Sequence, residues 1–280
     1  MHPDPEREEV MSTILVHVRG DRAFEDRRSV ALTLARKMGA HLTLAQTTDV
    51  VVVYSSAEFV GAFSSGPFIE AIRAEAADVR ARVEAQMAHE DVPFDFVTAQ
   101  GDEAAQLVAL SRLADLTVIS APEGGDGLLG TDPVFGALSV DAHAPFLMVP
   151  RGCSSIDLSA PVVIGWNGSA EAAAALRAAV PILKHAGPVH LVTIDDGGPA
   201  ALEGAEAARF LARHGIAATL VPLAGSAREA GAALLEYASG ASAGLLVAGI
   251  YGHWRMLERI VGGTSRTLVE NARIPVLFGR

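Results

Sequence analysis

The sequence predicts an α/β protein in which helices cover parallel β-sheets. Short apolar runs alternate with longer segments whose apolar residues recur at helical spacing. The same order of segments occurs twice along the 280 residues, once in each half. Half of the residues are hydrophobic but only 5% are aromatic. Alanine, valine and leucine are therefore expected to fill the core, as they do in helix-covered parallel sheets.

In the first half, five apolar runs are expected to form strands, separated by four helices. The first helix should end at Gly39, because glycine favours the left-handed conformation of a C-terminal cap. Pro67 suits the first turn of a long second helix, and Asp102 can cap the third. The expected strands are residues 13–19, 41–46, 93–99, 116–120 and 145–149, and the expected helices are residues 22–38, 67–89, 102–113 and a short one after residue 132.

The second half repeats this order after a polar linker at residues 151–160. Residues 114–120 (ADLTVIS) parallel residues 243–249 (AGLLVAG), and residues 143–150 parallel residues 273–279. Ser169 and Ser226 are expected to cap the first and third helices of this half. The expected strands are residues 161–166, 189–194, 216–222, 245–249 and 275–278, and the expected helices are residues 169–185, 200–213, 226–239 and 264–272. We therefore expect an N-terminal domain at residues 1–152 and a C-terminal domain at residues 158–280.

Charge is unevenly distributed between the halves. The formal net charge is -11; residues 1–150 carry 11 Lys and Arg against 23 Asp and Glu, whereas residues 151–280 carry 11 against 10. An acidic first half argues against nucleic acid and anionic membranes as its partners. Cys153 is the single cysteine, so no intramolecular disulfide can form. The acidic N-terminus does not resemble a signal peptide and no stretch is apolar and long enough to span a bilayer, so we expect a cytoplasmic protein.

The strongest functional signal lies in residues 245–271. An apolar run ends at Gly249, a glycine-spaced loop follows, and a helical pattern begins near Thr264. Glycine lets a ligand approach the backbone, and the first N–H groups of a helix have no partner within the helix, so this order suits a phosphate. Arg255, Arg259 and Arg266 against Glu258 give the stretch from Gly249 to Arg266 a net charge of +2.

With this loop the chain resembles a tandem universal stress protein. Gly249, Gly252 and Gly262 have the spacing of the family's nucleotide-binding pattern, G-x2-G-x9-G. The family usually has serine or threonine at the next position, where this chain has Gly263. The family often has an aspartate after the first strand, where this chain has Asn167.

The resemblance implies two flavodoxin-like, Rossmann-like domains, each a five-stranded parallel sheet flanked by helices, joined as an internal pseudo-dimer through their last strands. It also implies an adenine nucleotide, ATP or ADP, as the ligand of the C-terminal domain. The residues carried over are Gly165, Trp166, Asn167 and Ile194 near the nucleoside, and Gly249, Gly252, Gly262, Gly263, Thr264 and Ser265 near the phosphates.

The corresponding loop of the first half lacks this pattern. Residues 117–136 contain Glu123, Asp126 and Asp132 but no Lys or Arg. A polyphosphate placed there would be repelled by on the order of a few kcal/mol. We therefore expect the N-terminal domain to bind no nucleotide and to have a structural role.

Several alternatives stay open at this point. The glycines of the second half could serve only to turn the chain. Asp195 and Asp196 offer a magnesium contact, and His253 a phosphate contact, while His17 is expected to be a core or rim histidine. The apolar segment 59–68 is expected to be a packing flap, and it is also the best candidate for a ligand lid or a homodimer contact.

The expected function is regulatory. No general base, nucleophile or metal cluster is recognisable, so the sequence favours a stress-response protein that binds a nucleotide over a fast enzyme. A non-nucleotide-binding interaction scaffold and a slow ATP hydrolase are the alternatives.

Overall fold

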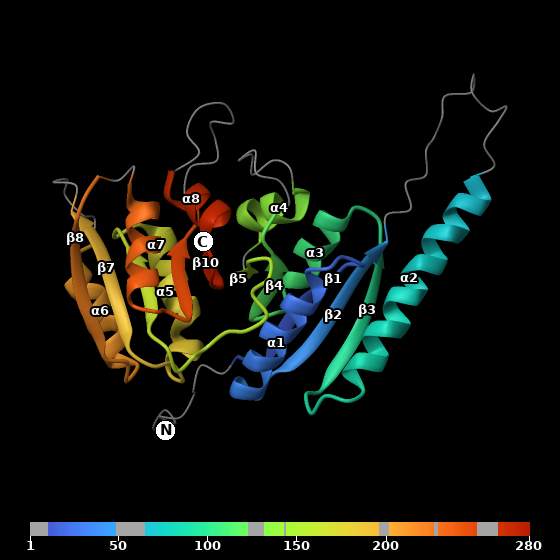
Figure 1. The fold of residues 1–280 in the computed structure, drawn as a ribbon, viewed down its shortest axis with the longest axis horizontal. Coiled ribbons are helices and arrows are strands. Elements are labelled where there is room, and N and C mark those ends of the chain that lie inside the picture. Colours follow the sequence, from blue (N-terminus) through green and yellow to red (C-terminus); the bar gives the residue numbers. More distant parts are fainter. Residues whose placement is uncertain are drawn as a thin grey trace, which may run out of the picture.

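The structure is a computed structural model, and it describes residues 11–48, 65–122, 132–142, 144–195, 202–226, 229–250 and 263–280 (Figure 1). Within these ranges, strands and helices alternate along the chain except at the junction of the halves, where β6 follows β5 without a helix between them. The strands are β1 Thr13–Val18, β2 His41–Thr48, β3 Phe94–Gln100, β4 Leu116–Ser120, β5 Phe146–Val149, β6 Val162–Trp166, β7 Val189–Asp195, β8 Ala218–Ala224, β9 Leu245–Gly249 and β10 Val276–Gly279. The helices are α1 Phe24–Met38, α2 Ser65–Met87, α3 Glu103–Ser111, α4 Pro133–Asp141, α5 Ala170–Leu183, α6 Gly204–Arg213, α7 Ala230–Gly240 and α8 Gly263–Asn271.

The strands of the described chain form one continuous sheet in the order β3-β2-β1-β4-β5-β10-β9-β6-β7-β8. Neighbouring strands are parallel except at the centre, where β5 and β10 run antiparallel. Each half has the same strand order, read outward from this central pair. The expected α/β fold with helix-flanked parallel sheets is confirmed.

The last strands of the two halves join them. Met148 lies opposite Val276 and Phe146 opposite Phe278, so each strand completes the other's open edge. The expected pairing of these two strands is confirmed. Three buried phenylalanines reinforce this junction: the ring of Phe135 on α4 meets those of Phe146 and Phe278 edge-on, at centroid distances of 5.5 and 6.2 Å.

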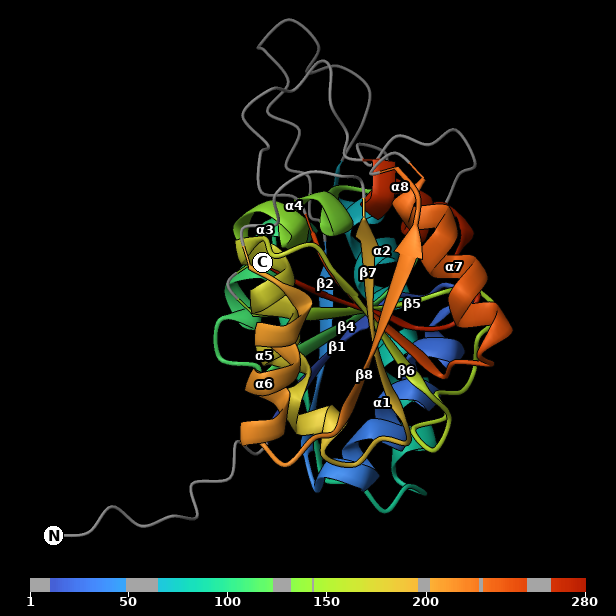
Figure 2. The same ribbon diagram turned by 90° about the vertical axis from the view of Figure 1, so that its left-hand side faces the viewer.

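Helices cover both faces of the sheet (Figure 2). One buried cluster contains side chains of α1, α2, α5 and α6, and the other contains side chains of α3, α4, α7 and α8. Successive strand residues enter opposite clusters: Ile14 and Val16 face the first, and Leu15 faces the second. Among the described helices, none combines the length and the apolar character needed to cross a bilayer.

Most of the expected helix caps are present. Gly39 ends α1 in the left-handed conformation with φ 66° and its N–H donates to the Ala35 carbonyl. Asp102 accepts from the Ala105 N–H at 2.8 Å, and Ser169 accepts from the Ala172 N–H at 3.1 Å.

The expected cap at Ser226 is wrong. Helix α7 begins later, at Ala230. The Ser226 carbonyl accepts from the Glu229 N–H at 3.0 Å, and its hydroxyl donates to the Glu229 carboxylate at 2.7 Å. These two bonds form a turn before the helix instead of its first cap.

The linker is more firmly packed than its polar sequence predicts. Ile156 and Leu158 are buried and join the core cluster that contains α1 and α5. Gly187 and Gly244 lie so close to the carbonyl groups of Ser159 and Asp157 that a β-carbon at either glycine would clash. The chain between the halves is therefore a fixed part of the structure.

Candidate nucleotide site and its counterpart in the first half

The described residues of the predicted nucleotide site lie at one edge of the sheet. Strand β6 pairs with β7 on one side and with β9 on the other, all parallel. Their carboxyl ends, near Trp166, Ile194 and Gly249, therefore meet at the same edge, where parallel α/β sheets commonly bind ligands. Helix α8 lies at this edge, toward which the arrowheads of β7 and β8 point (Figure 2).

Close packing against backbone requires glycine at Gly249, whereas at Gly165 only the end of a leucine side chain would have to move. A β-carbon on Gly249 would lie 2.6 Å from the Ala172 nitrogen, in the first turn of α5. A β-carbon on Gly165 would lie 2.9 Å from the Leu234 Cδ1 atom on α7. At Gly249, helix packing is thus a cause for glycine in addition to any ligand that approaches the loop.

Trp166 and Asn167 follow one another but point to different environments. The Trp166 side chain is 5% exposed and its indole N–H donates to the Leu202 carbonyl at 3.0 Å. Asn167 is exposed, and its side-chain oxygen accepts from the Ser169 N–H at 3.1 Å. Of these two residues, Asn167 therefore has a polar side-chain group available to a ligand at this edge, because the Trp166 indole N–H is already bonded.

The first turn of α8 carries two hydroxyl groups, one near the surface and one facing the core. Thr264 is partly exposed, whereas Ser265 is 7% exposed and lies on the inner side of the helix with Leu268. Thr264 is thus the better placed of the two to meet a phosphate. Gly252, Gly262, Arg255, Arg259 and His253 are outside the described residues.

The equivalent edge of the first half carries charged side chains. The register of β1 with β4 matches that of β6 with β9, so positions of the two halves can be compared directly. The replacements are His17 for Gly165, Arg19 for Asn167 and Ser120 for Gly249.

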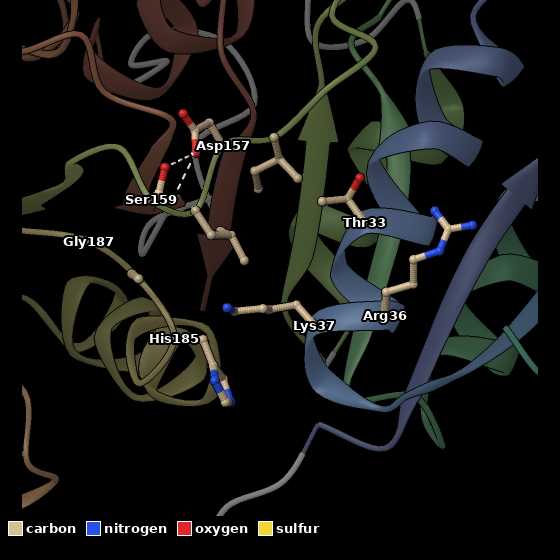
Figure 3. Close-up of a pocket in the computed structure, with 10 residues that line it drawn as sticks. Thr33, Arg36, Lys37, Asp157, Ser159, His185 and Gly187 are labelled. Atoms are coloured by element: carbon tan, nitrogen blue, oxygen red, sulfur yellow. Dashed lines mark hydrogen bonds between the residues drawn. The ribbon is translucent and has the colours of Figure 1, made fainter. Parts of the chain in front are cut away.

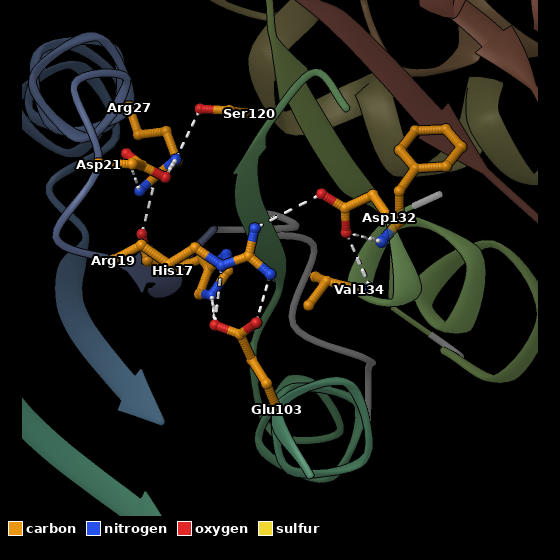
Figure 4. A network of polar contacts seen from close by, with 9 residues as sticks. His17, Arg19, Asp21, Arg27, Glu103, Ser120, Asp132 and Val134 are labelled. Atoms are coloured by element: carbon orange, nitrogen blue, oxygen red, sulfur yellow. Dashed lines mark hydrogen bonds and ion pairs between the residues drawn. The ribbon is translucent and has the colours of Figure 1, made fainter. Parts of the chain in front are cut away.

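These side chains take part in a network of hydrogen bonds and ion pairs with Glu103, Asp132 and Arg27 (Figure 4). The Nε2 atom of buried His17 lies 2.8 Å from Glu103 Oε1 on α3. Arg19 donates to both oxygens of Glu103, from Nε at 2.9 Å and from Nη2, and lies 3.5 Å from Asp132, the residue that caps α4. The network connects the end of β1 with the first turns of two helices.

Arg27 forms a second, more deeply buried group beside this network. Its side chain is 1% exposed. It donates to the His17 carbonyl at 2.9 Å, to the Ser120 hydroxyl at 2.7 Å and to both oxygens of Asp21 at 3.1 and 3.0 Å. Burial lowers the pKa of Arg27, and Asp21 opposes that shift. Every described contact of this guanidinium group satisfies a donor that would be costly to bury alone.

The network also fixes the protonation of its members. Burial opposes the ionisation of Glu103, but the hydrogen bonds from Arg19 and His17 outweigh it and hold the pKa of Glu103 well below its usual range. Burial lowers the pKa of His17, and the bond to Glu103 only partly offsets that effect. A neutral His17 therefore donates its Nε2–H to a charged Glu103 near pH 7.

We expect Glu103→Gln to lower the free energy of unfolding by roughly 2 kcal/mol near pH 7, because charged hydrogen bonds are lost. A depressed carboxyl pKa stabilises the fold above the unfolded-state value, and that stability disappears as the pH falls through the folded-state value. The difference between wild type and variant should therefore shrink below about pH 4.5. Urea unfolding at several pH values measures it. Glu75→Gln on the exposed surface of α2 removes the same charge and should have little effect at any pH. A difference for Glu103→Gln that is independent of pH would contradict this assignment.

The sequence alone missed most of this network. The expectation that His17 is a core or rim histidine is confirmed, but Arg19, Arg27 and Glu103 were not singled out. Residues 117–136 contain no Lys or Arg of their own, but Arg19 approaches Asp132 from a distant segment. A signal was present for Arg27, because it stands on the apolar stripe of α1 with Phe24 and Val30.

The remaining candidates are outside the described residues or show no ligand chemistry. The structure does not describe Asp196, His253, Glu123 or Asp126. It also does not describe the side chains of the segment from Phe59 to Phe68. Cys153 is half-buried, and burial raises the pKa of its thiol. In the described part of the chain, no three His, Cys, Asp or Glu side chains come together to hold a metal ion.

Comparison with solved structures identifies the fold. A universal stress protein from Archaeoglobus fulgidus DSM 4304 superposes with a TM-score of 0.75 at 16% identity, covering 96% of this chain and 97% of that one. A protein of unknown function from Pseudomonas aeruginosa PAO1 gives a TM-score of 0.58 at 15% identity, with 95% and 92% coverage. A provisionally assigned universal stress protein from Pseudomonas aeruginosa UCBPP-PA14 gives 0.53 at 15% identity, with 96% and 92% coverage. No protein-family model and no curated protein matches the sequence. Over nearly its whole length, this chain has the fold of universal stress proteins.

Proposed function

We propose that the chain is a tandem universal stress protein that binds an adenine nucleotide, ATP or ADP, in a C-terminal domain at residues 158–280. The N-terminal domain, residues 1–152, is its structural partner. The observation that carries the proposal is the contrast between equivalent edges of the sheet. The first half fills this edge with paired charges, whereas the second half has glycines at the ends of its strands.

The described residues of the second half fit the chemistry of a nucleotide. The side chain of Asn167 can donate to a ribose or a base, and Thr264 with the first N–H groups of α8 can donate to phosphate oxygens. Arg266, bound to Glu270 at 2.7 Å, is a further cation near the start of α8. The proposed set also includes the loop glycines Gly252 and Gly262, on the strength of their spacing.

Paired charged side chains occupy the equivalent edge of the first half. His17 stands in the position of Gly165, and its ring is fixed by Glu103. Arg19 stands in the position of Asn167 and is already paired with two carboxylates. A nucleotide in this half would have to break charge-assisted bonds, which is why we assign the half a structural role.

The first test is to identify by mass any nucleotide that stays bound to the purified full-length protein. The second is a fluorescence titration with ATP, with and without Mg²⁺, since Trp166 and Trp254 are the only tryptophans in the sequence: Trp166 belongs to the proposed set, and Trp254 falls in sequence between Gly252 and Gly262. We expect ATP to change the emission and Gly262→Asp to abolish that change, because a carboxylate in the loop would repel phosphates.

Gly240→Asp is the matched control. It introduces the same charge at a glycine on α7 where a β-carbon would meet no other atom within 4 Å. This variant should respond to ATP as the wild type does. A flat wild-type titration up to millimolar ATP would leave the interaction-scaffold alternative as the better account.

A further inference from the structure

A cavity of about 670 Å³ lies away from the proposed nucleotide site, where the two halves face each other (Figure 3). Its walls are the last turns of α1 from the first half, the linker, and the residues that follow α5. The proposed nucleotide site lies at the carboxyl ends of the strands, whereas this cavity lies near the ends of helices that return to the amino edge. A volume of this size is typical of sites for small molecules.

The walls of this cavity are held in place. Ile156 and Leu158 line it and are only 4% and 6% exposed, so they are anchored in the core and present a narrow apolar surface to the cavity. The Gly187 N–H donates to the Leu158 carbonyl at 2.7 Å. Because Gly187 has no side chain, the linker at Ser159 can pack directly against the backbone that follows α5. The apolar part of the cavity is therefore already formed before any ligand enters.

The polar lining is predominantly basic. Lys37 extends from α1 into the space between α1 and α5, and His185 lies across from it (Figure 3). Among described residues, Lys37 forms no hydrogen bond or ion pair. Its neighbour Arg36 binds Glu90 and Asp91 instead, at 2.5 and 2.7 Å.

The acid in the lining is already engaged. Asp157 accepts from the Ser159 N–H at 2.9 Å and from the Ser159 hydroxyl at 2.6 Å. The C-terminal ends of α1 and α5 carry partial negative charge, and hydrogen bonds accepted by the Ala35 carbonyl of α1 and the Val180 carbonyl of α5 offset part of it. Lys37 thus remains the charge that a ligand can neutralise.

We propose that this cavity binds a small organic anion with an apolar body. The anionic group contacts Lys37 and His185, and the apolar body packs on Ile156 and Leu158. Such a ligand would touch both halves and the linker at once, and would therefore stabilise their arrangement.

The test uses the full-length protein and anilinonaphthalene sulfonate, whose sulfonate is attached to apolar rings. Lys37 and Lys184 are the only lysines in the sequence, so labelling with an acetylating reagent, read by mass after digestion, compares them within one sample. Both lysines are exposed in the free protein, so we expect the probe to slow acetylation of Lys37 several-fold and to leave that of Lys184, outside the cavity, unchanged. Lys37→Met should weaken probe binding about five- to tenfold, as loss of one charge-assisted contact predicts.

Lys184→Met removes the same charge outside the cavity and should bind the probe as the wild type does. N-phenylnaphthylamine, which has similar rings without the sulfonate, should bind more weakly and lose no affinity in Lys37→Met. Equal protection of both lysines, or unchanged affinity in Lys37→Met, would overturn the proposal. ATP is not expected to protect Lys37, so the outcome is independent of the proposed nucleotide site.

Discussion

Replacing Arg27 with methionine should lower the free energy of unfolding by about 3 kcal/mol, one of the two largest effects that we expect in this chain. Methionine preserves much of the apolar stem but removes all the donors of the guanidinium group. The buried His17 carbonyl and the Ser120 hydroxyl then lose a hydrogen-bond partner. The Asp21 carboxylate, which is 22% exposed, loses its ion pair and can be solvated only on its exposed side. The loss is measured by urea unfolding followed by circular dichroism.

Arg209→Met is the matched control for Arg27→Met. Arg209 lies on α6, is 57% exposed and forms one ion pair with Glu206 within its own helix. Exposed pairs of this kind contribute less than about 0.5 kcal/mol, so the control should unfold almost as the wild type does. If both substitutions had the same small effect, Arg27 would not be the structural centre of the first half's edge.

Arg27 also explains why the two halves differ in a fold that otherwise repeats. At the corresponding edge of the second half, the first turn of α5 packs directly on Gly249. In the first half, Ser120 occupies that position and receives a hydrogen bond from the arginine. At this position a hydrogen bond from a charged side chain connects helix and strand in the first half, whereas direct helix–strand packing connects them in the second. This difference is one basis for our proposal that the second half, and not the first, holds the ligand.

The overall fold could be predicted from sequence because its signals are local and occur twice. Strand β4 matches its expected range of residues 116–120, and the cap residues Gly39, Asp102 and Ser169 behave as their chemistry requires. The central pairing of β5 with β10 could be anticipated partly from the resemblance and partly because it covers strand edges that would otherwise be exposed.

The candidate site was less accessible to sequence reasoning, for a physical reason. Arg19 and Asp132 are far apart in the sequence, and only the register of β1 with β4 and the start of α4 bring them together. Likewise, the sequence marks Gly249 as permissive but does not say that α5 fills the space beside it. Spacing identifies residue types that suit a ligand, whereas tertiary contacts decide which of them remain free to bind one.

The second large effect is expected at the junction of the halves. Phe278→Ala should lower the free energy of unfolding by about 3–5 kcal/mol, because it empties a fully buried site beside two other rings. Phe278 lies on β10 opposite Phe146 on β5, so its ring packs across the boundary of the two halves. Urea unfolding measures the change, with Leu220→Ala as the control at the other end of the sheet.

Leu220 lies on edge strand β8 and is 43% exposed, so its truncation should cost well under half of that amount. Phe278→Leu, which restores most of the volume, should recover most of the lost stability. If Phe278→Ala were no worse than Leu220→Ala, the packing across β5 and β10 would contribute little to holding the halves together. The strand pairing would then depend mainly on its backbone hydrogen bonds, and each half should fold when expressed alone.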